Sequence, residues 1–282
     1  MDVQTESFRF GTVDRLFVEY VKRSAPYTMG ADHFHPYYEI YYMLSGSRIY
    51  FVGDRSYPVE QGDLVFIKPN VLHQTMHAGD PEHERLVVHF GDAFLNGFSS
   101  LHRALLLSPF EQASKVIRLP RQEQLPVDRQ LRRLADELRH KPAGYELVPA
   151  AAVTDLLLTA ARYLQEHDPV PIHHDTPLHA KISEIVRHID AHFAEPLTLR
   201  ELSDRFYISP HYLSRKFKEI TGFAYTDYLV LTRIKEAQRL LRETDKSITE
   251  VAADVGFDNF SHFGKTFKRI AKVPPRDYRK QI

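Results

Sequence analysis

Histidine, glutamate and tyrosine side chains in the N-terminal third occur at a spacing that suits ligand binding. His33, His35 and Glu39 form the pattern His-x-His-x3-Glu, and His73 follows later in the chain. Alternate residues of a strand point to the same face, so a continuous strand over residues 33–39 would bring these side chains and Tyr37 together. His73 would approach the same point from a neighbouring strand as a further ligand.

Three interpretations of these residues remain open from the sequence alone. In the first, they line an effector pocket and hydrogen-bond a small organic molecule such as a sugar. In the second, they hold a divalent metal ion, since imidazole and carboxylate donors suit Zn²⁺, Mn²⁺, Fe²⁺ and Ni²⁺. In the third, they form a hydrogen-bonded network that only orders the domain, and no cofactor is required. The aromatic rings that could stack on a sugar are those of Tyr37, Tyr41, Tyr50 and Phe66.

The elements that must position these residues are short strands. Segments rich in Tyr, Val, Ile and Phe are separated by glycine turns, which predicts an antiparallel barrel or sandwich over the first ~90 residues. The His-x-His-x3-Glu pattern followed by His73 resembles the two histidine motifs of cupin barrels. That resemblance implies a divalent metal at His33, His35, Glu39 and His73. The predicted strands are residues 16–21, 39–44, 48–52, 64–67 and 86–90.

The periodicity then changes from strand to helix. Leucine spacing predicts amphipathic helices over residues 128–140 and 149–166, which are candidates for a dimer contact or for relaying a change between domains. A proline-rich stretch follows, and everything after it reads as helix. The sequence therefore predicts an α+β multidomain protein. It comprises a cupin-like antiparallel β-barrel domain with appended helices (residues 1–170), a linker (171–177) and an all-α domain (178–282).

The C-terminal third contains an internal repeat. The segment that begins at Glu201 recurs at Glu250, and the segment that begins at Phe217 recurs at Phe267, offsets of 49 and 50 residues. The extra residue falls where a turn between helices would lie, so each copy reads as helix, tight turn and helix.

Turn residues support the boundaries of the two copies. In the second copy, Gly256 suits the left-handed position after a helix, and Asp258 is predicted to cap the next helix. In the first copy, Ser209 is the predicted cap and Pro210 the first helical residue, while Tyr207 stands where a glycine is expected.

The second helix of each copy is amphipathic. Leu213, Phe217 and Ile220 make an apolar stripe in the first copy, and Phe263 and Phe267 begin the matching stripe in the second. The opposite faces are short, basic and rich in donors, which suits the major groove of DNA. Residues 226–242 would form the helix that separates the two units by about 34 Å, one turn of B-DNA. The polar faces carry His211, Ser214, Arg215 and Lys218, and Ser261, Gly264, Lys265 and Lys268.

Residues 197–279 resemble the DNA-binding domain of the AraC/XylS-type bacterial transcription regulators. The similar stretches are LTLRELSDRFYISPHYLSRKFKEITG, SITEVAADVGFDNFSHFGKTFKR and PPRDYR. The resemblance implies a module of seven helices, the first near residues 180–193, and an N-terminal barrel that senses a ligand. It places His211, Ser214 and Arg215, and Ser261, His262 and Lys265, at base-facing positions. Lys218 and Lys268 are expected to contact phosphates.

Composition agrees with a nucleic-acid-binding C-terminal domain. Residues 178–282 hold 19 Lys and Arg against 14 Asp and Glu, a net charge of +5, whereas residues 1–177 hold 18 against 23, or −5. The absence of cysteine excludes disulfides and thiolate metal sites. We expect a cytoplasmic protein, because no secretory signal is evident and the apolar stretch 148–164 is interrupted by Asp155 and Arg162.

We therefore expect a sequence-specific transcription regulator rather than an enzyme. Its expected partners are double-stranded promoter DNA, a small-molecule effector, a second copy of the chain and RNA polymerase, with no membrane. A metal-dependent cupin enzyme with an accessory helical domain is the alternative, but it leaves the repeated unit unexplained. A second alternative is a helical module whose basic faces bind an acidic protein. The sequence does not distinguish activation from repression.

Overall fold

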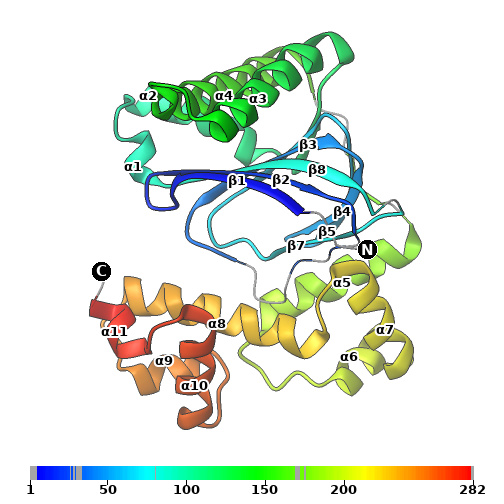
Figure 1. Ribbon diagram of the computed structural model, residues 1–282. Helices are drawn as coiled ribbons and strands as arrows, with labels where there is room; N and C mark the ends of the chain where they lie inside the picture. The colour runs from blue at the N-terminus through cyan, green and yellow to red at the C-terminus, as the bar shows by residue number, and fades with distance from the viewer. Residues whose placement is uncertain are drawn as a thin grey trace.

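The chain folds into a stack of layers (Figure 1). In this computed structural model, a helical layer covers a large sheet, a smaller sheet lies beneath it, and a helical C-terminal domain lies below both. The predicted α+β class with two domains is confirmed. The structure describes residues 5–25, 27, 29, 34–79, 81–168, 172–174 and 176–280.

The larger sheet has six antiparallel strands in the order β1-β2-β8-β3-β6-β9. All five strand segments predicted from the sequence are present, and four of them lie in this sheet. The strands are β1 (Thr5–Thr12), β2 (Leu16–Arg23), β3 (Tyr38–Ser45), β6 (Asp63–Ile67), β8 (His83–Phe90) and β9 (Val116–Arg118).

The smaller sheet has the order β5-β4-β7 and faces the larger one. Its strands are β4 (Ser47–Val52), β5 (Arg55–Glu60) and β7 (His73–His77). Buried side chains of both sheets, including Tyr41, Tyr50 and Val65, fill the space between them. Within the described residues no ladder joins the two sheets, so the cupin-like barrel is open.

Helices cover the outer face of the larger sheet. They are α1 (Asp92–Leu95), α2 (Ser100–Leu107), α3 (Arg121–His140) and α4 (Val148–Glu166), with the short 3₁₀ turns η1 (Ser108–Glu111) and η2 (Tyr145–Leu147). Leu131, Leu134, Leu156 and Leu157 are fully buried and belong to one core with the outer face of the sheet. Burial of the apolar stripes of α3 and α4 holds this layer on the sheet.

The segment Tyr145–Glu166 is long and apolar enough, by length and composition alone, to cross a membrane. We expected Asp155 and Arg162 to make this segment too polar to cross a membrane, but its composition does not exclude a membrane-spanning helix. Its packing accounts for the apolar character, because Val153, Leu156 and Ala160 are fully buried in the core. A core helix of a soluble domain meets the same composition test.

The C-terminal domain contains seven helices within residues 176–280, as the resemblance implied. They are α5 (Pro177–His192), α6 (Leu199–Phe206), α7 (Pro210–Thr221), α8 (Tyr225–Glu243), α9 (Ile248–Asp254), α10 (Phe260–Ala271) and α11 (Pro275–Lys280). The long helix α8 runs between the α6–α7 unit and the α9–α10 unit (Figure 1). A single rigid element therefore fixes the separation of the two repeated units.

The repeat extends to the helix caps. Thr198 with Glu201, and Ser247 with Glu250, each form a capping box at the start of the first helix of a copy. Tyr207 adopts the left-handed conformation with φ 53°, at the position where the second copy reaches Gly256 with φ 84°. The prediction that Asp258 caps α10 is wrong, because the side chain of Asn259 accepts the hydrogen bond from the amide of His262.

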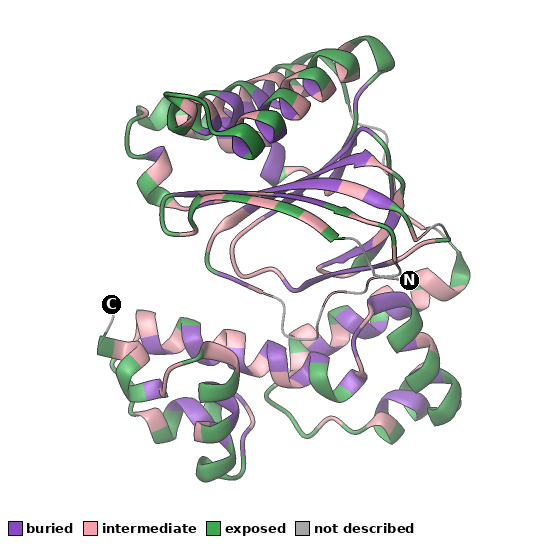
Figure 2. Ribbon diagram, viewed as in Figure 1, coloured by how far each residue is buried: buried purple, intermediate pink, exposed green. Residues whose placement is uncertain are grey.

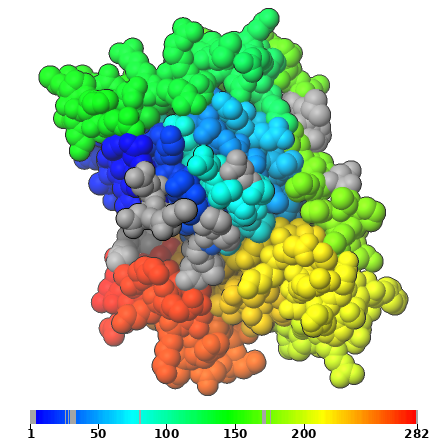
Figure 3. Space-filling model, turned by 45° about the vertical axis from the view of Figure 1, so that its right-hand side comes forward, coloured from blue at the N-terminus to red at the C-terminus, as the bar shows by residue number. Residues whose placement is uncertain are grey.

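The two domains are in contact through the smaller sheet (Figure 3). Phe51 of β4 packs edge-on against Phe223 and Tyr228, with ring centroids 6.2 and 6.3 Å apart. The Ser56 hydroxyl donates to the carbonyl oxygen of Ile220 at 2.7 Å, across the domain boundary. Arg187 of α5 pairs with Asp54 at 2.7 Å. The first helix-turn-helix unit is thus docked on the N-terminal domain.

Candidate functional site

Helices α7 and α10 occupy equivalent positions in the two repeated units. Each buries the apolar stripe predicted from its sequence, with Leu213 and Phe217 of α7 and Phe263 and Phe267 of α10 at most 1% exposed. The opposite faces of both helices are solvent-exposed over much of their length (Figure 2). Each helix therefore has one face buried in its own core and one face open to solvent.

All of the proposed DNA-contacting side chains are exposed. The Arg215 guanidinium lies 5.6 Å from the ring centroid of the neighbouring Tyr212, and the His262 ring lies 5.6 Å from that of the core residue Phe257. Lys216 differs from its neighbours, since it pairs with Glu219 at 2.7 Å on the same helix. The exposed candidates are His211, Ser214, Arg215, Lys218, Ser261, His262, Lys265 and Lys268.

A groove runs beside the polar face of α10. Its volume is about 580 Å³, and it is lined by Ser261, Lys265 and Lys268 together with Phe260 and Arg276. Phe260 is 51% exposed although it is a large apolar residue. Sequence reasoning missed Phe260 and Arg276, because only the return of the chain through Pro274 and Pro275 brings the α11 end beside α10.

The histidine cluster lies between the two sheets of the N-terminal domain, around the carboxylate of Glu39. His35 Nε2 and His89 Nε2 lie 3.0 and 2.9 Å from Glu39 Oε2, and His73 Nε2 lies 3.5 Å from the same oxygen. Tyr50 donates its hydroxyl hydrogen bond to the other oxygen, Oε1, at 2.7 Å. Glu39 lies on β3, Tyr50 on β4, His73 on β7 and His89 on β8. His35 lies in the loop before β3.

The cluster differs from the predicted set in two respects. His33 lies outside the described residues, and the cluster includes His89, which the sequence prediction did not include. The predicted continuous strand over residues 33–39 is wrong, because β3 begins at Tyr38. Pro36 explains the break, since proline cannot donate to a ladder. His35 still reaches Glu39 from the preceding loop.

Burial and neighbouring charge set the protonation of this cluster. Burial alone would raise the pKa of Glu39, but His73 and hydrogen bonds from His35, His73 and His89 lower that pKa well below its usual value. Burial also lowers the pKa of His35, partly offset by Glu39. Burial and the adjacent Glu39 raise the pKa of the Tyr50 hydroxyl, which stays protonated. The centre therefore combines a carboxylate with imidazole groups.

The aromatic residues proposed to stack on a sugar have different surroundings. Tyr37 is half-buried and stacks on His35 with ring centroids 4.0 Å apart, next to His89 at 4.8 Å. Tyr41 is fully buried against Tyr50. Phe66 does not face the cluster, because it belongs to the core under the helices, where it packs on Phe110.

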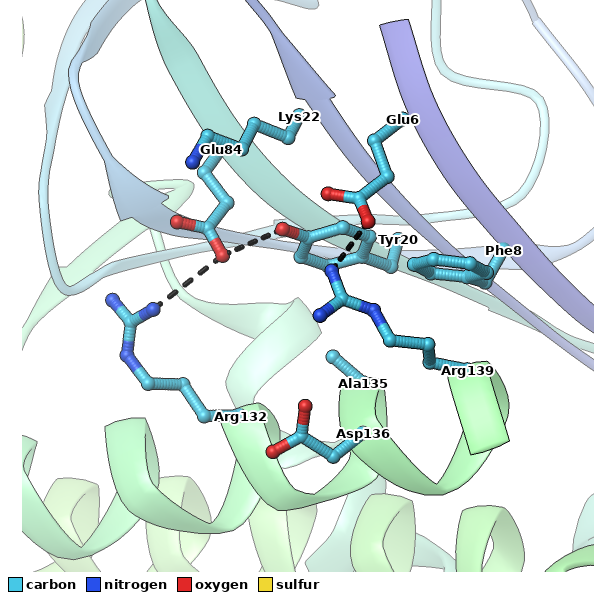
Figure 4. Close-up of a pocket in the computed structure, with 9 residues that line it drawn as sticks. All are labelled: Glu6, Phe8, Tyr20, Lys22, Glu84, Arg132, Ala135, Asp136 and Arg139. Atoms are coloured by element: carbon cyan, nitrogen blue, oxygen red, sulfur yellow. Dashed lines mark hydrogen bonds and ion pairs between the residues drawn. The ribbon is translucent and has the colours of Figure 1, made fainter. Parts of the chain in front are cut away.

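A separate polar cavity of about 290 Å³ lies between the outer face of the larger sheet and α3 (Figure 4). The Tyr20 hydroxyl donates to Glu84 at 2.8 Å, and Arg132 pairs with the same carboxylate at 3.4 Å. Burial and the bond to Glu84 raise the pKa of Tyr20. Arg139 pairs with Glu6. These charges neutralise one another and attach α3 to β1, β2 and β8.

A sheet domain with a buried polar cluster, joined to a helical domain with two exposed recognition faces, defines a two-domain DNA-binding regulator. Residues 19–163 match the model of the AraC-like ligand binding domain, and residues 202–281 match that of a helix-turn-helix domain. The chain belongs to the AraC family of transcription regulators, with a ligand-binding N-terminal domain and a DNA-binding C-terminal domain.

Three similar proteins illustrate how the matches are distributed along the chain. The regulatory protein PocR of Salmonella typhimurium is 36% identical over 38% of this chain and 35% of its own length. The HTH-type transcriptional activator RhaS of Escherichia fergusonii is 27% identical over 88% of this chain and 87% of its own length. The solved C-terminal domain of AraT, a response regulator from Geobacillus stearothermophilus, is 32% identical over 38% of this chain and 87% of that chain, with a TM-score of 0.35.

Proposed function

We propose that this regulator reads promoter DNA with α7 and α10 in successive major grooves, and that a small molecule bound in the N-terminal domain biases this contact. The observation that carries the proposal is the pair of exposed polar helix faces held apart by α8. Arg215 is the leading base reader, since a guanidinium can contact guanine with two hydrogen bonds. Lys265 replaces it in the second unit as a single-point donor.

The docked domains supply a route for the effector to act. Tyr50 and Phe51 are neighbours on β4, and the first contacts Glu39 while the second packs on Phe223 and Tyr228. His73 and Gln74 are likewise neighbours on β7, and His73 contacts Glu39. Gln74 packs closely against Gly222 of the C-terminal domain, where an added Cβ atom would lie only 2.7 Å from Gln74 Cγ. A ligand that shifts either strand changes the contact with the junction between α7 and α8, provided that it binds the two states with different affinity.

Related proteins and the surroundings of Tyr37 support what we propose for the finer parts of the function. RhaS is a transcriptional activator by name, and we propose that this chain also activates transcription, through contact with RNA polymerase and in the cytoplasm. A carbohydrate is the proposed effector class, because the half-buried Tyr37 ring beside His89 offers an aromatic face next to polar groups. A cupin enzyme is not favoured, since the similar proteins named above are regulators.

An electrophoretic shift on the DNA upstream of the protein's own gene, at several salt concentrations, tests the DNA-binding proposal. We expect affinity to fall steeply with salt, because Lys and Arg displace counterions from phosphates. Replacing Lys218 or Lys268 with alanine should weaken binding to all sequences alike and lower the salt slope by about one each. Lys246, which pairs with Asp254 at 2.8 Å, is the control and should leave the slope unchanged. A salt-independent shift would contradict DNA binding through phosphates.

We further propose a homodimer formed through α3 and α4. Their outer face carries a groove of about 430 Å³ that includes Leu147, and this leucine is 78% exposed. We expect Leu147→Glu to weaken self-association at least about tenfold, because a buried charge replaces an apolar anchor. Leu101→Glu on α2, where the leucine is 76% exposed, is the matched control. Sedimentation that finds only monomer at micromolar concentration, with and without DNA, would contradict the dimer.

A further inference from the structure

We infer that Arg48, together with Arg23 and Arg85, binds a negatively charged oxygen group of the effector, a carboxylate or a phosphate, inside the N-terminal domain. The site lies between the two sheets and away from the histidine cluster, since Arg85 pairs with Met43 near the end of β3. The inference rests on the proposed function and deepens it, because it assigns a charge to the small molecule that this domain is proposed to bind.

The strand register brings basic side chains of both sheets to one end of the space between them. Arg48 of β4 alternates with Tyr50, which is buried between the sheets, so both side chains point into that space. Arg23 and His83 lie opposite each other on β2 and β8. Arg85 is two residues further along β8 and therefore lies on the same face as His83.

These basic groups are close enough to act on one another. Burial lowers the pKa of His83 to about 4, and the charges of Arg48, Arg85 and Arg23 act in the same direction. Burial also lowers the pKa of Arg48, and the charge of Arg85 adds to that effect. A guanidinium nevertheless stays charged at neutral pH. Several positive charges are therefore held together at this end of the domain.

Arg48 is the central residue, because it is buried without a counter-charge. Its side chain is only 1% exposed. Its Nη2 donates to the carbonyl oxygen of Tyr27 and, at 3.2 Å, to the hydroxyl of Thr75. Its Nε and Nη1 have no hydrogen-bond partner, and no carboxylate pairs with it, among the residues that the structure describes. Burial of an unpaired charge is costly, so such a group normally has a partner when the protein functions.

The neighbouring groups do not supply the missing charge. Glu19 accepts from Arg85 at 3.3 Å, but it is shared with Arg9, which donates to it at 2.7 Å. The Arg23 guanidinium lies over the ring of Tyr27, 4.0 Å from its centroid, and its Nε has no partner in the described part of the chain. The excess positive charge therefore favours an anion that comes from outside the protein.

The unused donors of Arg48 suit an oxyanion better than a neutral group. The Nε atom carries one hydrogen and Nη1 carries two, and none of the three has an acceptor among the described residues. A sugar hydroxyl could accept from them but would leave the charge uncompensated. A carboxylate or a phosphate supplies both the acceptor oxygens and the negative charge, and its hydrogen bonds to a guanidinium are about twice as strong as neutral ones.

The strands that carry this site also contact the DNA-binding domain. Ile49 follows Arg48 on β4, and it packs against the core that includes Phe223. Met76 follows Thr75 on β7 and belongs to the same core. The two side chains that bond to each other inside the domain, Arg48 and Thr75, are thus next to residues that touch the first helix-turn-helix unit. An anion that moves Arg48 acts on both strands of this contact.

Thermal unfolding of the full-length protein with simple anions tests the inference without DNA. The probes are sodium acetate, which offers a carboxylate, and sodium phosphate, each compared with sodium chloride at the same pH and ionic strength. We expect acetate, phosphate or both, at about 50 mM, to raise the Tm by about 3 °C or more over chloride, because a ligand of the folded state stabilises that state. A shift with acetate alone assigns a carboxylate, and a shift with phosphate alone assigns a phosphate.

Variants of Arg48 separate binding from a general salt effect. Arg48→Met should leave a shift of less than about 1 °C, whereas Arg48→Lys, which keeps the charge with fewer donors, should keep part of it. In chloride, Arg48→Met should lower the Tm by less than about 3 °C, because removal of an unpaired buried charge offsets the loss of two hydrogen bonds. Arg121→Ala, at an exposed arginine of α3, should keep the wild-type shift.

Arg23 keeps the test decisive if Arg48→Met does not fold. Arg23 is half-buried at the edge of the site, so Arg23→Gln leaves the core intact and should reduce the shift by about half or more. Two results would overturn the inference: wild-type protein whose Tm neither anion raises over chloride, or a shift that the Arg48 and Arg23 variants retain in full. Failure of the DNA-binding proposal appears separately, because these measurements contain no DNA.

Discussion

Replacing Arg215 with alanine is expected to lower affinity for the operator about 5- to 100-fold, with a much smaller effect on unrelated DNA. The side chain is exposed on the polar face of α7, and it has no ion-pair partner among the described residues that would be lost at the same time. In the double variant Arg215→Ala/Lys265→Ala, the loss of binding free energy should equal the sum of the losses in the two single variants. The two helices are proposed to read separate segments of DNA, so their effects are independent. Fluorescence anisotropy with operator and scrambled duplexes measures both affinities.

Two controls distinguish a base contact from a simple loss of charge. Arg215→Lys keeps the positive charge but cannot make the two parallel hydrogen bonds, so specific affinity should fall while binding to scrambled DNA stays near wild type. Arg121→Ala removes an exposed arginine of α3 in the other domain and should change neither affinity. Equal weakening on operator and scrambled DNA by Arg215→Ala would reassign this residue to a phosphate contact.

The largest stability effect is expected at Phe217. This side chain is fully buried in the first helix-turn-helix unit, with ring centroids 6.2 and 5.7 Å from those of Tyr225 and Tyr228. Phe217→Ala leaves a cavity in that core, and we expect it to lower the free energy of unfolding by about 3–5 kcal/mol. The variant should also lose operator binding, because α7 is no longer held in place. Urea denaturation followed by circular dichroism measures the change.

Phe260→Ala is the matched control for that measurement. Phe260 begins α10 in the second unit and is 51% exposed, so its removal should cost less than about 1 kcal/mol. Similar destabilisation by the two substitutions would mean that α7 does not bury its apolar stripe as described.

The helical domain could be predicted from the sequence because its signals are local. The apolar stripe of α7 and Pro210 at its first position are visible within one or two turns of helix, and the segment at Glu201 recurs at Glu250. Ser209 does lie at the N-cap of α7 as predicted, but its side chain makes no capping hydrogen bond. The helix predicted over residues 128–140 is the later part of α3, which begins at Arg121 and contains Pro126. The cost of one missing backbone hydrogen bond near the start of a helix is offset by the packing of its later turns.

Several strands could not be predicted, because tertiary pairing decides them. Strand β7 (His73–His77) is polar in sequence, and β5 (Arg55–Glu60) contains Pro58. Both are strands because they pair with β4, whose own sequence has a strong strand pattern. Local propensity underestimates such segments.

The composition of the histidine cluster depended on strand register. Glu39 lies directly opposite His89 in the pairing of β3 with β8, and nothing local in the sequence fixes that register. The strand predicted over residues 86–90 contains His89, but that prediction does not place it beside Glu39. The sequence therefore identified His35, Glu39 and His73 and could not identify His89.

Chemical footprinting of guanine and thymine contacts on a selected operator tests the central claim most directly. We predict two protected major-groove segments per protein molecule, about one helical turn or 10 base pairs apart. Arg215→Ala should erase protection in one segment and Lys265→Ala in the other. A single protected segment, or two segments that both substitutions affect equally, would contradict an account in which α7 and α10 each read their own groove.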